Sequence, residues 1–479
     1  MRKTKIIATL GPATDDPQVL RSLLEAGLDV ARLNFSHESH EKHKARVDAL
    51  RQACKETGTT VAVLGDTKGP EIRLGTFENG RVELEAGNNF TLTSSDVTGD
   101  DTRVSVTYSS LPQEVTPGAR ILIDDGLIEL KVEHVTGNDI STKVMIGGPV
   151  SDRKGVNVPG ISLDIPYISA KDRMDLRFFV ENDFDIIAAS FVRSADDIKE
   201  IREELNRISG STKIRIIAKI ENADGVKNAD SILAVCDGLM VARGDLGVEV
   251  AHEELPIIQK DLIRKSVSRG KPCITATQML ESMINNPRPT RAETSDVANA
   301  IYDGTSAIML SGETAVGKYP LKVLNTMSKI AERIERNIDY RQRFLRGEYR
   351  AETSVTNAIS HATVSTSHDL RTAAIVTASM SGTTAQNVAK YRPTCPIIAC
   401  TPDPVVQRQL KLIWGVIPLL TGAETETSAQ FNQAVDAALA SKYIEKGDLV
   451  VLTAGVPVGH SGTTNMLMVH VAGSEVRIS

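Results

Sequence analysis

The chain has 479 residues, of which 41% are hydrophobic and 24% are charged, and its formal net charge is -6. This length exceeds what one hydrophobic core usually organises, so we expect two or three domains. The acidic balance argues against a general nucleic-acid-binding protein and against binding to anionic membranes, and no apolar run approaches the ~20 residues of a membrane helix. An N-terminus without a signal-peptide pattern and five scattered cysteines predict a reduced, cytoplasmic protein.

Short apolar runs alternate with helical segments at the start of the chain and again from about residue 166. Such runs begin at residues 5, 30, 61, 184, 215, 238, 272 and 307. Eight strand–helix units predict a (β/α)8 barrel, which carries its chemistry at the C-terminal ends of its strands. An open, doubly wound sheet is the alternative architecture.

Residues 74–165 interrupt this alternation with a period-two pattern, punctuated by Gly, Asn, Asp and Pro, that is typical of short half-buried strands. Because the strand–helix alternation resumes afterwards, we interpret this segment as an inserted all-β module rather than an independent binding domain in tandem. The sequence therefore predicts a barrel at residues 1–70 and 166–345, with a small β-barrel domain inserted at 71–165.

A charge-rich stretch at residues 330–350 predicts a solvated helix that joins two units, and we prefer this to a basic binding patch. Five further apolar runs follow, most of them separated by helical segments. They predict a C-terminal α/β domain at residues 346–479.

Charged residues end the two neighbouring runs that begin at 215 and 238. Lys219 and Glu221 end the first, and Arg243 and Asp245 end the second. Because burying these charges would be costly, we expect them to emerge at open strand ends. Two carboxylates beside a lysine suit a hard divalent cation and a phosphoryl group in transfer.

Polar groups also end other predicted strands. Any one of them is more often an ordinary strand terminus than a catalytic group. Convergence of five strand ends on one barrel mouth makes coincidence much less plausible. These further groups are Arg32, Asn34, Ser36, His37, Asp66, Thr67, Glu71, Arg73 and Thr277.

Three loops have alternative interpretations. Glycines beside Asp245 suit either a backbone nest for a carboxylate or an ordinary turn. Residues 312–318 nearly match a P-loop, but Tyr319 replaces the metal-binding hydroxyl, so we expect a plain loop there. Ser379 to Thr384, at a strand-to-helix junction, suits a phosphate or a simple helix cap, and a second hydroxyl-rich loop follows at 460–465.

Six motifs in this order resemble those of the pyruvate kinase family, and the resemblance covers essentially the whole chain. It implies a barrel with an inserted lid and a C-terminal allosteric domain. It further implies a cytoplasmic homotetramer that converts phosphoenolpyruvate and ADP into pyruvate and ATP in the final step of glycolysis. The motifs are ARLNFSH (31–37), DTKGPEIR (66–73), AKIEN (218–222), MVARGDLG (240–247), ATQMLESM (276–283) and NPRPTRAE (286–293).

The resemblance also implies residue roles. Lys219, Arg73 and Thr277 would be catalytic, and Glu221 and Asp245 would bind Mg²⁺ or Mn²⁺. Glu71 is the form of its position associated with K⁺ dependence. The substrate would contact Arg32, Lys219, Ala242, Arg243, Gly244, Asp245 and Thr277. The nucleotide would contact Arg32, Asn34, His37, Arg73 and Lys171. The K⁺ ion would be bound by Asn34, Ser36, Asp66 and Thr67.

For regulation, the resemblance implies a phosphorylated allosteric effector bound by Ser379, Ser381, Gly382, Thr383 and Thr384. Residues 456–460 lack the tryptophan and arginine of the animal and fungal pattern. A sugar monophosphate or a nucleotide is therefore as plausible an effector as fructose 1,6-bisphosphate. Two other functions remain as alternatives: a metal-dependent aldolase or lyase of pyruvate-like enolates, and a non-catalytic metabolite sensor.

Overall fold

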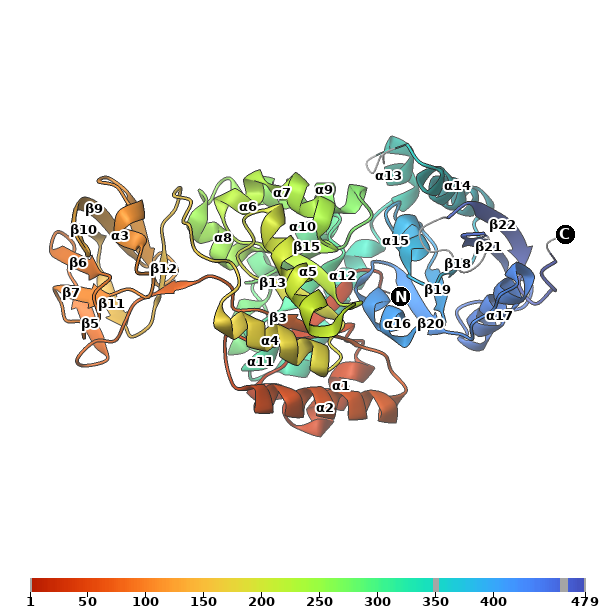
Figure 1. Ribbon diagram of the computed structural model, residues 1–479. Coiled ribbons are helices and arrows are strands. Elements are labelled where there is room, and N and C mark those ends of the chain that lie inside the picture. The colour runs from red at the N-terminus through yellow and green to blue at the C-terminus, as the bar shows by residue number, and fades with distance from the viewer. Residues whose placement is uncertain (1, 348–352, 457–463, 478–479) are drawn as a thin grey trace.

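The computed structural model describes residues 2–347, 353–456 and 464–477. Figure 1 shows three units in a row, with the inserted β module at one end, the barrel in the centre and the C-terminal unit at the other end. No helix of the described residues is long and apolar enough to cross a membrane. The exact domain boundaries given above remain predictions.

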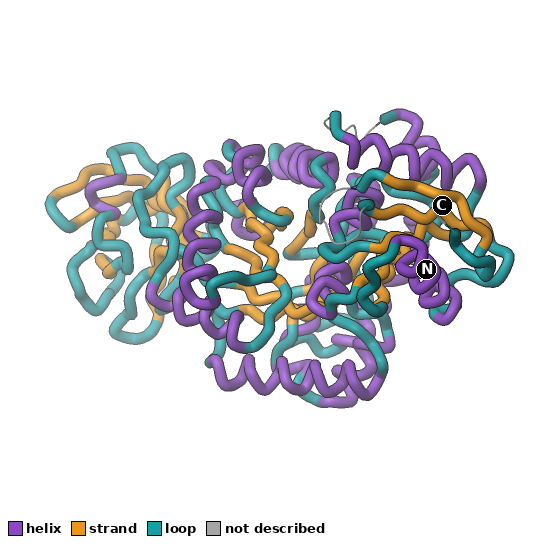
Figure 2. The backbone as a smooth tube through the Cα atoms, turned by 45° about the vertical axis from the view of Figure 1, so that its right-hand side comes forward, coloured by secondary structure: helices purple, strands orange, loops and turns teal. Residues whose placement is uncertain are grey.

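The central unit is a closed barrel of eight parallel strands, which confirms the (β/α)8 prediction over the open sheet. Figure 2 shows its strands enclosed by helices. One cluster of fully buried residues, including Ile7 and Met240, fills the barrel, while a larger cluster packs the strands against the helices. In order around the barrel, the strands are β1 (Lys5–Thr9), β17 (Ala307–Leu310), β16 (Cys273–Ala276), β15 (Gly238–Ala242), β14 (Arg215–Ile220), β13 (Ile186–Ala189), β3 (Ala62–Asp66) and β2 (Val30–Asn34).

Helices follow the barrel strands and begin at well-defined caps. Ser169, Ser194 and Thr290 each form a capping box with an acidic residue three positions later, which satisfies free amides of the first helical turn. The described residues of the charge-rich stretch lie mainly on the C-terminal part of α12 (Pro320–Glu335) and on α13 (Tyr340–Arg346). The larger barrel helices are α1 (Pro17–Glu25), α2 (His40–Thr57), α4 (Ala170–Glu181), α5 (Ala195–Ser209), α9 (Leu255–Ser268), α10 (Arg291–Asp303) and α12 (Pro320–Glu335).

The inserted module lies between β3 and β13 in the sequence and has a hydrophobic core of its own, which confirms the insertion. Its strands form a seven-stranded sheet and a separate two-stranded sheet, and it includes one short helix, α3 (Leu111–Glu114). The strands are β4 (Ile72–Arg73), β5 (Arg81–Leu84), β6 (Asn89–Thr93), β7 (Arg103–Ser105), β8 (Arg120–Ile123), β9 (Ile128–Thr136), β10 (Asp139–Ile146), β11 (Gly148–Ser151) and β12 (Gly155–Asn157).

The C-terminal unit is a five-stranded sheet with buried clusters on both faces, as its apolar runs predict. Its strands lie in the order β20 (Val416–Leu420), β19 (Ile397–Thr401), β18 (Ala374–Ala378), β21 (Leu449–Ala454) and β22 (Met466–Val471), and only β22 is antiparallel to its neighbour. The helices include α14 (Val355–Leu370), α15 (Thr383–Ala389), α16 (Pro404–Gln409) and α17 (Thr427–Ala440).

Ion pairs join this unit to the N-terminal face of the barrel. Arg408, at the end of α16, lies 2.7 Å from Asp185, which directly precedes β13. Lys411 lies 3.2 Å from Asp29, which directly precedes β2. The C-terminal unit is therefore attached to the barrel face opposite the predicted site.

Candidate active site

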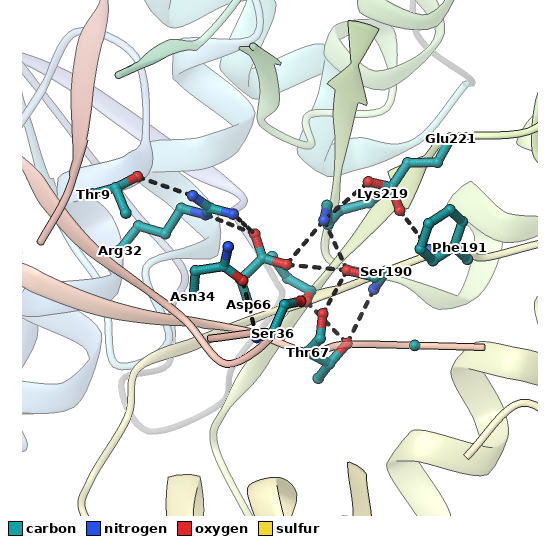
Figure 3. Close-up of polar contacts among 12 residues, drawn as sticks. Thr9, Arg32, Asn34, Ser36, Asp66, Thr67, Ser190, Phe191, Lys219 and Glu221 are labelled. Atoms are coloured by element: carbon teal, nitrogen blue, oxygen red, sulfur yellow. Dashed lines mark hydrogen bonds and ion pairs between the residues drawn. The ribbon is translucent and has the colours of Figure 1, made fainter. Parts of the chain in front are cut away.

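The C-terminal ends of β2, β3 and β14 bring three predicted site residues together: Asn34, Asp66 and Lys219. Asn34 pairs with Asp66 in the register of β2 and β3, and β13 joins β3 to β14. Side chains from these strand ends point into one cluster around Asp66 and Lys219 (Figure 3). The prediction that polar strand ends converge is confirmed for this part of the barrel mouth.

Lys219 is buried at the centre of this cluster, with 9% of its surface exposed. Its ammonium group donates to Asp66 at 2.9 Å and to the Ser190 hydroxyl at 2.7 Å, and it lies 2.9 Å from Glu221. Burial alone would lower the pKa of Lys219, but Asp66 and Glu221 raise it above its ordinary value. The structure therefore holds a permanently charged ammonium at a fixed position.

Asp66 lies between two cations and is 1% exposed. Arg32 contacts the same Asp66 oxygen through Nε and Nη2, both at 2.7 Å, and donates to Thr9 at 3.0 Å. Burial would raise the pKa of Asp66, but Arg32 and Lys219 hold it below its usual range. Asp66 therefore stays ionised and fixes the positions of both cations (Figure 3).

Glu221 is also 1% exposed and accepts a 2.6 Å hydrogen bond from the backbone amide of Phe191. Burial raises the pKa of Glu221 to about 8, against the opposing effect of Lys219 and with a further rise from Asp245. The negative charge of Asp245 therefore acts on Glu221, the other predicted metal ligand. Their mutual repulsion would be relieved by a divalent cation.

Asp245 lies in the first turn of α8 (Arg243–Glu249), which directly follows β15. No group of three or more His, Cys, Asp or Glu side chains that could hold a metal occurs in the described part of the chain. A metal at Glu221 and Asp245 would therefore take its remaining ligands from water or substrate oxygens, as Mg²⁺ commonly does.

The turn after β16 lies against the start of α8. The Gly244 amide donates to the Thr277 hydroxyl at 2.7 Å, and this hydroxyl donates to the Ala276 carbonyl at 2.6 Å. Thr277 has a φ of 68°, a left-handed conformation that is rare for a β-branched residue and frequent at functional sites. The Arg243 side chain is already engaged by Asp296 and by the Thr277 carbonyl, each at 2.7 Å. Any contact of Arg243 with a substrate here would come from its backbone.

The residues predicted to bind K⁺ lie at or just after the ends of β2 and β3, around Asp66 (Figure 3). The Asn34 side-chain oxygen accepts from the Ser36 amide at 3.1 Å. The Thr67 hydroxyl accepts from the Ser190 amide at 3.1 Å, and the Thr67 carbonyl accepts from the Ser190 hydroxyl at 2.7 Å. Ser190 thus links the K⁺ group to Lys219, although the sequence analysis did not single it out.

Two residues predicted to face the nucleotide are held at the neighbouring edge of the mouth. Lys171, on α4, donates to the Phe35 carbonyl at 2.7 Å and to Asp175 at 2.6 Å. The His37 carbonyl contacts the ring of His43 at 2.9 Å.

Arg73 lies in the inserted module rather than in the barrel cluster. It forms two hydrogen bonds with Glu71, at 2.9 and 2.6 Å. A cavity of about 300 Å³ runs between the module and the barrel mouth, and Glu71, Asp125 and Asp245 are among its lining residues. Burial, and then Asp245, raise the pKa of Asp125, so the module presents a carboxyl group toward the predicted metal site.

The near P-loop match is not a phosphate loop. Residues 312–315 form a short helix, and Glu313 is 2% exposed. Its carboxylate accepts hydrogen bonds from the amides of Leu280 and Ser311. A buried carboxylate at this point would repel a phosphate.

The predicted effector loop lies at the junction of β18 and α15. The Ser379 hydroxyl accepts from the Gly382 amide at 3.1 Å, and the hydroxyls of Ser381 and Thr383 are 2.9 Å apart. Most of the second predicted effector loop (457–463) lies outside the described residues.

Comparisons with known proteins agree with this fold. Family profiles described as "Pyruvate kinase, barrel domain" and "Pyruvate kinase, alpha/beta domain" match residues 1–324 and 357–470. A pyruvate kinase from Geobacillus stearothermophilus is 52% identical over 472 residues, which are 98% of this chain and 80% of the relative. One from Sporosarcina psychrophila is 48% identical over 478 residues, covering 99% and 81%. A crystal structure of a pyruvate kinase from Cryptosporidium parvum superposes with a TM-score of 0.93 at 39% identity, covering 98% of this chain and 96% of that one.

Proposed function

The chain belongs to the pyruvate kinase family, and we propose that it transfers the phosphoryl group of phosphoenolpyruvate to ADP, giving pyruvate and ATP. The observation that carries the proposal is the buried Lys219 ammonium between Asp66 and Glu221, at an open mouth that also presents Asp245. Phosphoryl transfer needs mainly positioning and charge neutralisation, and this cluster supplies both.

The residues would act as follows. Lys219 stabilises the phosphoryl group during transfer. The bond between phosphorus and the enol oxygen breaks, and a bond forms between phosphorus and a terminal oxygen of ADP. The amides around Gly244 and Asp245 would receive the substrate carboxylate, and the Gly244 amide would then exchange its present hydrogen bond to the Thr277 hydroxyl for one to the substrate. A divalent cation held by Glu221 and Asp245 would supply neutralising charge to the phosphoryl and enolate oxygens. The enolate then takes one proton at its methylene carbon, on the side of Thr277.

The nucleotide and K⁺ would occupy the adjacent groups. Arg32, His37 and Lys171 face the nucleotide in this proposal. Asn34, Ser36, Asp66 and Thr67 supply oxygen ligands for K⁺. The inserted module closes over the mouth as a lid, so that the phosphoryl group reaches ADP rather than water. We further propose a homotetramer regulated by a phosphorylated effector at Ser379 to Thr384.

The two alternative functions have less support. An aldolase would need neither the inserted module nor Arg32 and Lys171, and the similar proteins reported above are pyruvate kinases. A non-catalytic sensor would be expected to have lost site residues, whereas every predicted group is present in the sequence.

A steady-state assay tests the proposal. ATP formation from phosphoenolpyruvate and ADP is measured with Mg²⁺, with and without K⁺, across a panel of sugar phosphates and AMP. We expect activity that depends on both cations and is increased by one member of the panel. Pyruvate–aldehyde cleavage without ATP formation would instead support the aldolase.

A further inference from the structure

Two linkers connect the inserted module to the barrel, and both are hydrogen-bonded to barrel residues. On the first linker, the Gly69 amide donates to Asp172 at 3.2 Å. On the second, the Leu163 and Ile165 carbonyls accept from Arg193, both at 2.9 Å. These contacts fix the places where the linkers leave the barrel. They leave the orientation of the module's strands to be set by other contacts.

One hydrogen bond joins the strands of the module to the barrel within the described residues. Asn157, the last residue of β12, donates through its side chain to the Glu249 carboxylate at 2.9 Å. β12 lies at the side of the module nearest the barrel (Figure 1). Glu249 is the last residue of α8. The bond between Asn157 and Glu249 therefore connects the module directly to a helix of the barrel mouth.

The Glu249 carboxylate depends on this hydrogen bond. Its side chain is half-buried, and no cation pairs with it among the described residues. Burial raises the pKa of Glu249, the hydrogen bond from Asn157 opposes the rise, and Asp224 and Asp245 add to it. Losing Asn157 would leave a partly buried carboxylate without this donor, which is costly and so favours keeping the contact.

Asn157 is close to Arg73 in the sheet of the module. β12 pairs antiparallel with β4, and Gly155 lies opposite Arg73. Asn157 is two residues further along β12, which corresponds to about 7 Å at the usual strand rise. Because backbone hydrogen bonds hold paired strands in register, a displacement of Asn157 would also displace the backbone of Arg73.

The same strand supports the turn of the module that faces the metal site. On its other side β12 pairs with β8, and Asp124 and Asp125 lie in the turn after β8. Both have a positive φ, of 54° and 55°, which is uncommon for residues other than glycine and frequent at functional sites. Asp125 lines the cavity together with Asp245. Glu249 therefore holds the middle strand of the three that carry these groups.

On the barrel side, Glu249 shares a helix face with the predicted metal ligand. Asp245 lies in the first turn of α8, four residues before Glu249, and both side chains line the cavity. Residues four apart on a helix are neighbours on one face, about 6 Å apart along the axis. One short helix thus carries both a predicted metal ligand and the attachment point of the module.

We propose that Glu249 is a positioning residue for phosphoryl transfer. Through Asn157 it sets the placement of β12, and with it that of Arg73 on the paired strand β4, relative to Asp245 on its own helix. The effect on turnover rests on the proposed function, whereas the attachment of the module through Glu249 does not.

Steady-state ATP formation by the full chain tests this role. Glu249→Ala should lower kcat by about tenfold or more, because misplacing a catalytic group by about 1 Å can have an effect of this size. Glu249→Gln keeps an oxygen that accepts from Asn157, so it should retain most of the activity. Glu253→Ala, at an exposed position four residues later, should match wild type.

Asn157→Ala removes the same hydrogen bond from the module side. It should lower kcat about as much as Glu249→Ala, and the double variant should lose no more than either single variant, because both act through one contact. It also provides a second route if Glu249→Ala fails to fold, which circular dichroism would show.

Hydrogen–deuterium exchange measures the attachment without any assay of activity. We expect residues 158–165, the linker that follows Asn157, to exchange faster in Glu249→Ala and Asn157→Ala than in wild type. Glu249→Gln and Glu253→Ala should exchange as wild type does.

Three kinetic results would overturn the proposal: a folded Glu249→Ala with the kcat of wild type, a Glu249→Gln as impaired as Glu249→Ala, or additive losses in the double variant. Unchanged exchange of the linker in both alanine variants would refute the attachment itself. A wild-type chain that forms no ATP refutes the proposed function, while faster exchange in the alanine variants would leave the attachment standing.

Discussion

The ammonium group of Lys219 lies 2.9 Å from the carboxylate of Asp66, although the two residues are 153 positions apart in the chain. The inserted module accounts for much of that separation, since it lies between β3 and β13. Because β13 pairs with both β3 and β14, the ends of β3 and β14 lie on either side of Ser190, which directly follows β13. The site therefore depends on long-range topology, while each of its parts is encoded at a local strand end.

Lys219→Met should abolish phosphoryl transfer while a divalent metal still binds. The substitution removes the only positive charge in direct contact with both Asp66 and Glu221 among the described residues. Removing a cation that stabilises a transferring phosphoryl group typically costs about a thousandfold or more in kcat. ATP formation measures turnover, and titration with Mn²⁺ followed by electron paramagnetic resonance measures metal binding. Unchanged turnover would refute the role of Lys219.

Glu71→Lys should reduce the requirement for K⁺, because an ammonium group can replace a monovalent cation at this edge of the site. Glu71 now makes two hydrogen bonds to Arg73, and it lines the cavity between module and barrel. The initial rate of ATP formation at saturating Mg²⁺ is measured as K⁺ is replaced by a large, non-binding cation.

Glu71→Gln is the control for this substitution. It removes the same negative charge but supplies no ammonium group, so it should remain K⁺-dependent. If Glu71→Lys stays as dependent on K⁺ as wild type, the interpretation of this position is wrong.

Asp29→Asn should destabilise the fold by about 3–5 kcal/mol, the usual cost of removing one partner from a buried ion pair. Asp29 lies 2.9 Å from Arg2, 3.7 Å from Lys5 and 3.2 Å from Lys411. Burial alone would raise the pKa of Asp29, but these three cations hold it well below its ordinary value. The substitution would leave Lys5 buried without its carboxylate.

The pH dependence gives a second check on Asp29. Its folded-state pKa is depressed, so its contribution to stability is present above the unfolded pKa of about 3.9 and is lost as the pH falls through the folded value. The melting temperatures of wild type and Asp29→Asn should differ most near neutral pH and converge in strong acid. Glu56→Gln, in an exposed pair with Arg21, should leave the melting temperature nearly unchanged. A gap that widens in acid would contradict the argument.

The barrel could be predicted because buried parallel strands are read as short apolar runs, and because charge appears where each run ends. The same rule located Lys219, Glu221 and Asp66. It missed Ser190, since this small polar residue falls inside the apolar run of residues 184–191 and interrupts it only slightly. The end of β13 at Ala189 makes Ser190 a strand-end residue like the others.

Contacts between distant segments could not be predicted from local patterns. The sequence shows Arg215 only as the start of a strand, whereas the structure joins it to Ser381, 166 residues later. The approach of Asp125 to Asp245, one of the predicted metal ligands, depends on how the module is placed against the barrel. Both relationships arise from domain packing, which leaves no periodic signal in the sequence.

Asp175 holds Lys171, which we propose faces the nucleotide, and so we expect it to act as a positioning residue. Its carboxylate is fully buried and contacts Lys171 at 2.6 Å and the His40 ring at 2.6 Å. Lys171 in turn donates to the Phe35 carbonyl, two residues before His37. Losing the charge of Asp175 would release the Lys171 ammonium from its fixed position, while the Lys219 cluster would be unaffected.

Asp175→Asn should therefore raise the KM for ADP by about tenfold, since it weakens a charge-assisted contact, and leave the KM for phosphoenolpyruvate nearly unchanged. The matched control is Asp48→Asn, because Asp48 also pairs with a lysine one helical turn away but is 60% exposed. Steady-state kinetics with each substrate varied in turn distinguishes the two variants. An equal rise in both KM values, or a fall in melting temperature with no change in the KM for ADP, would show that Asp175 only stabilises the fold.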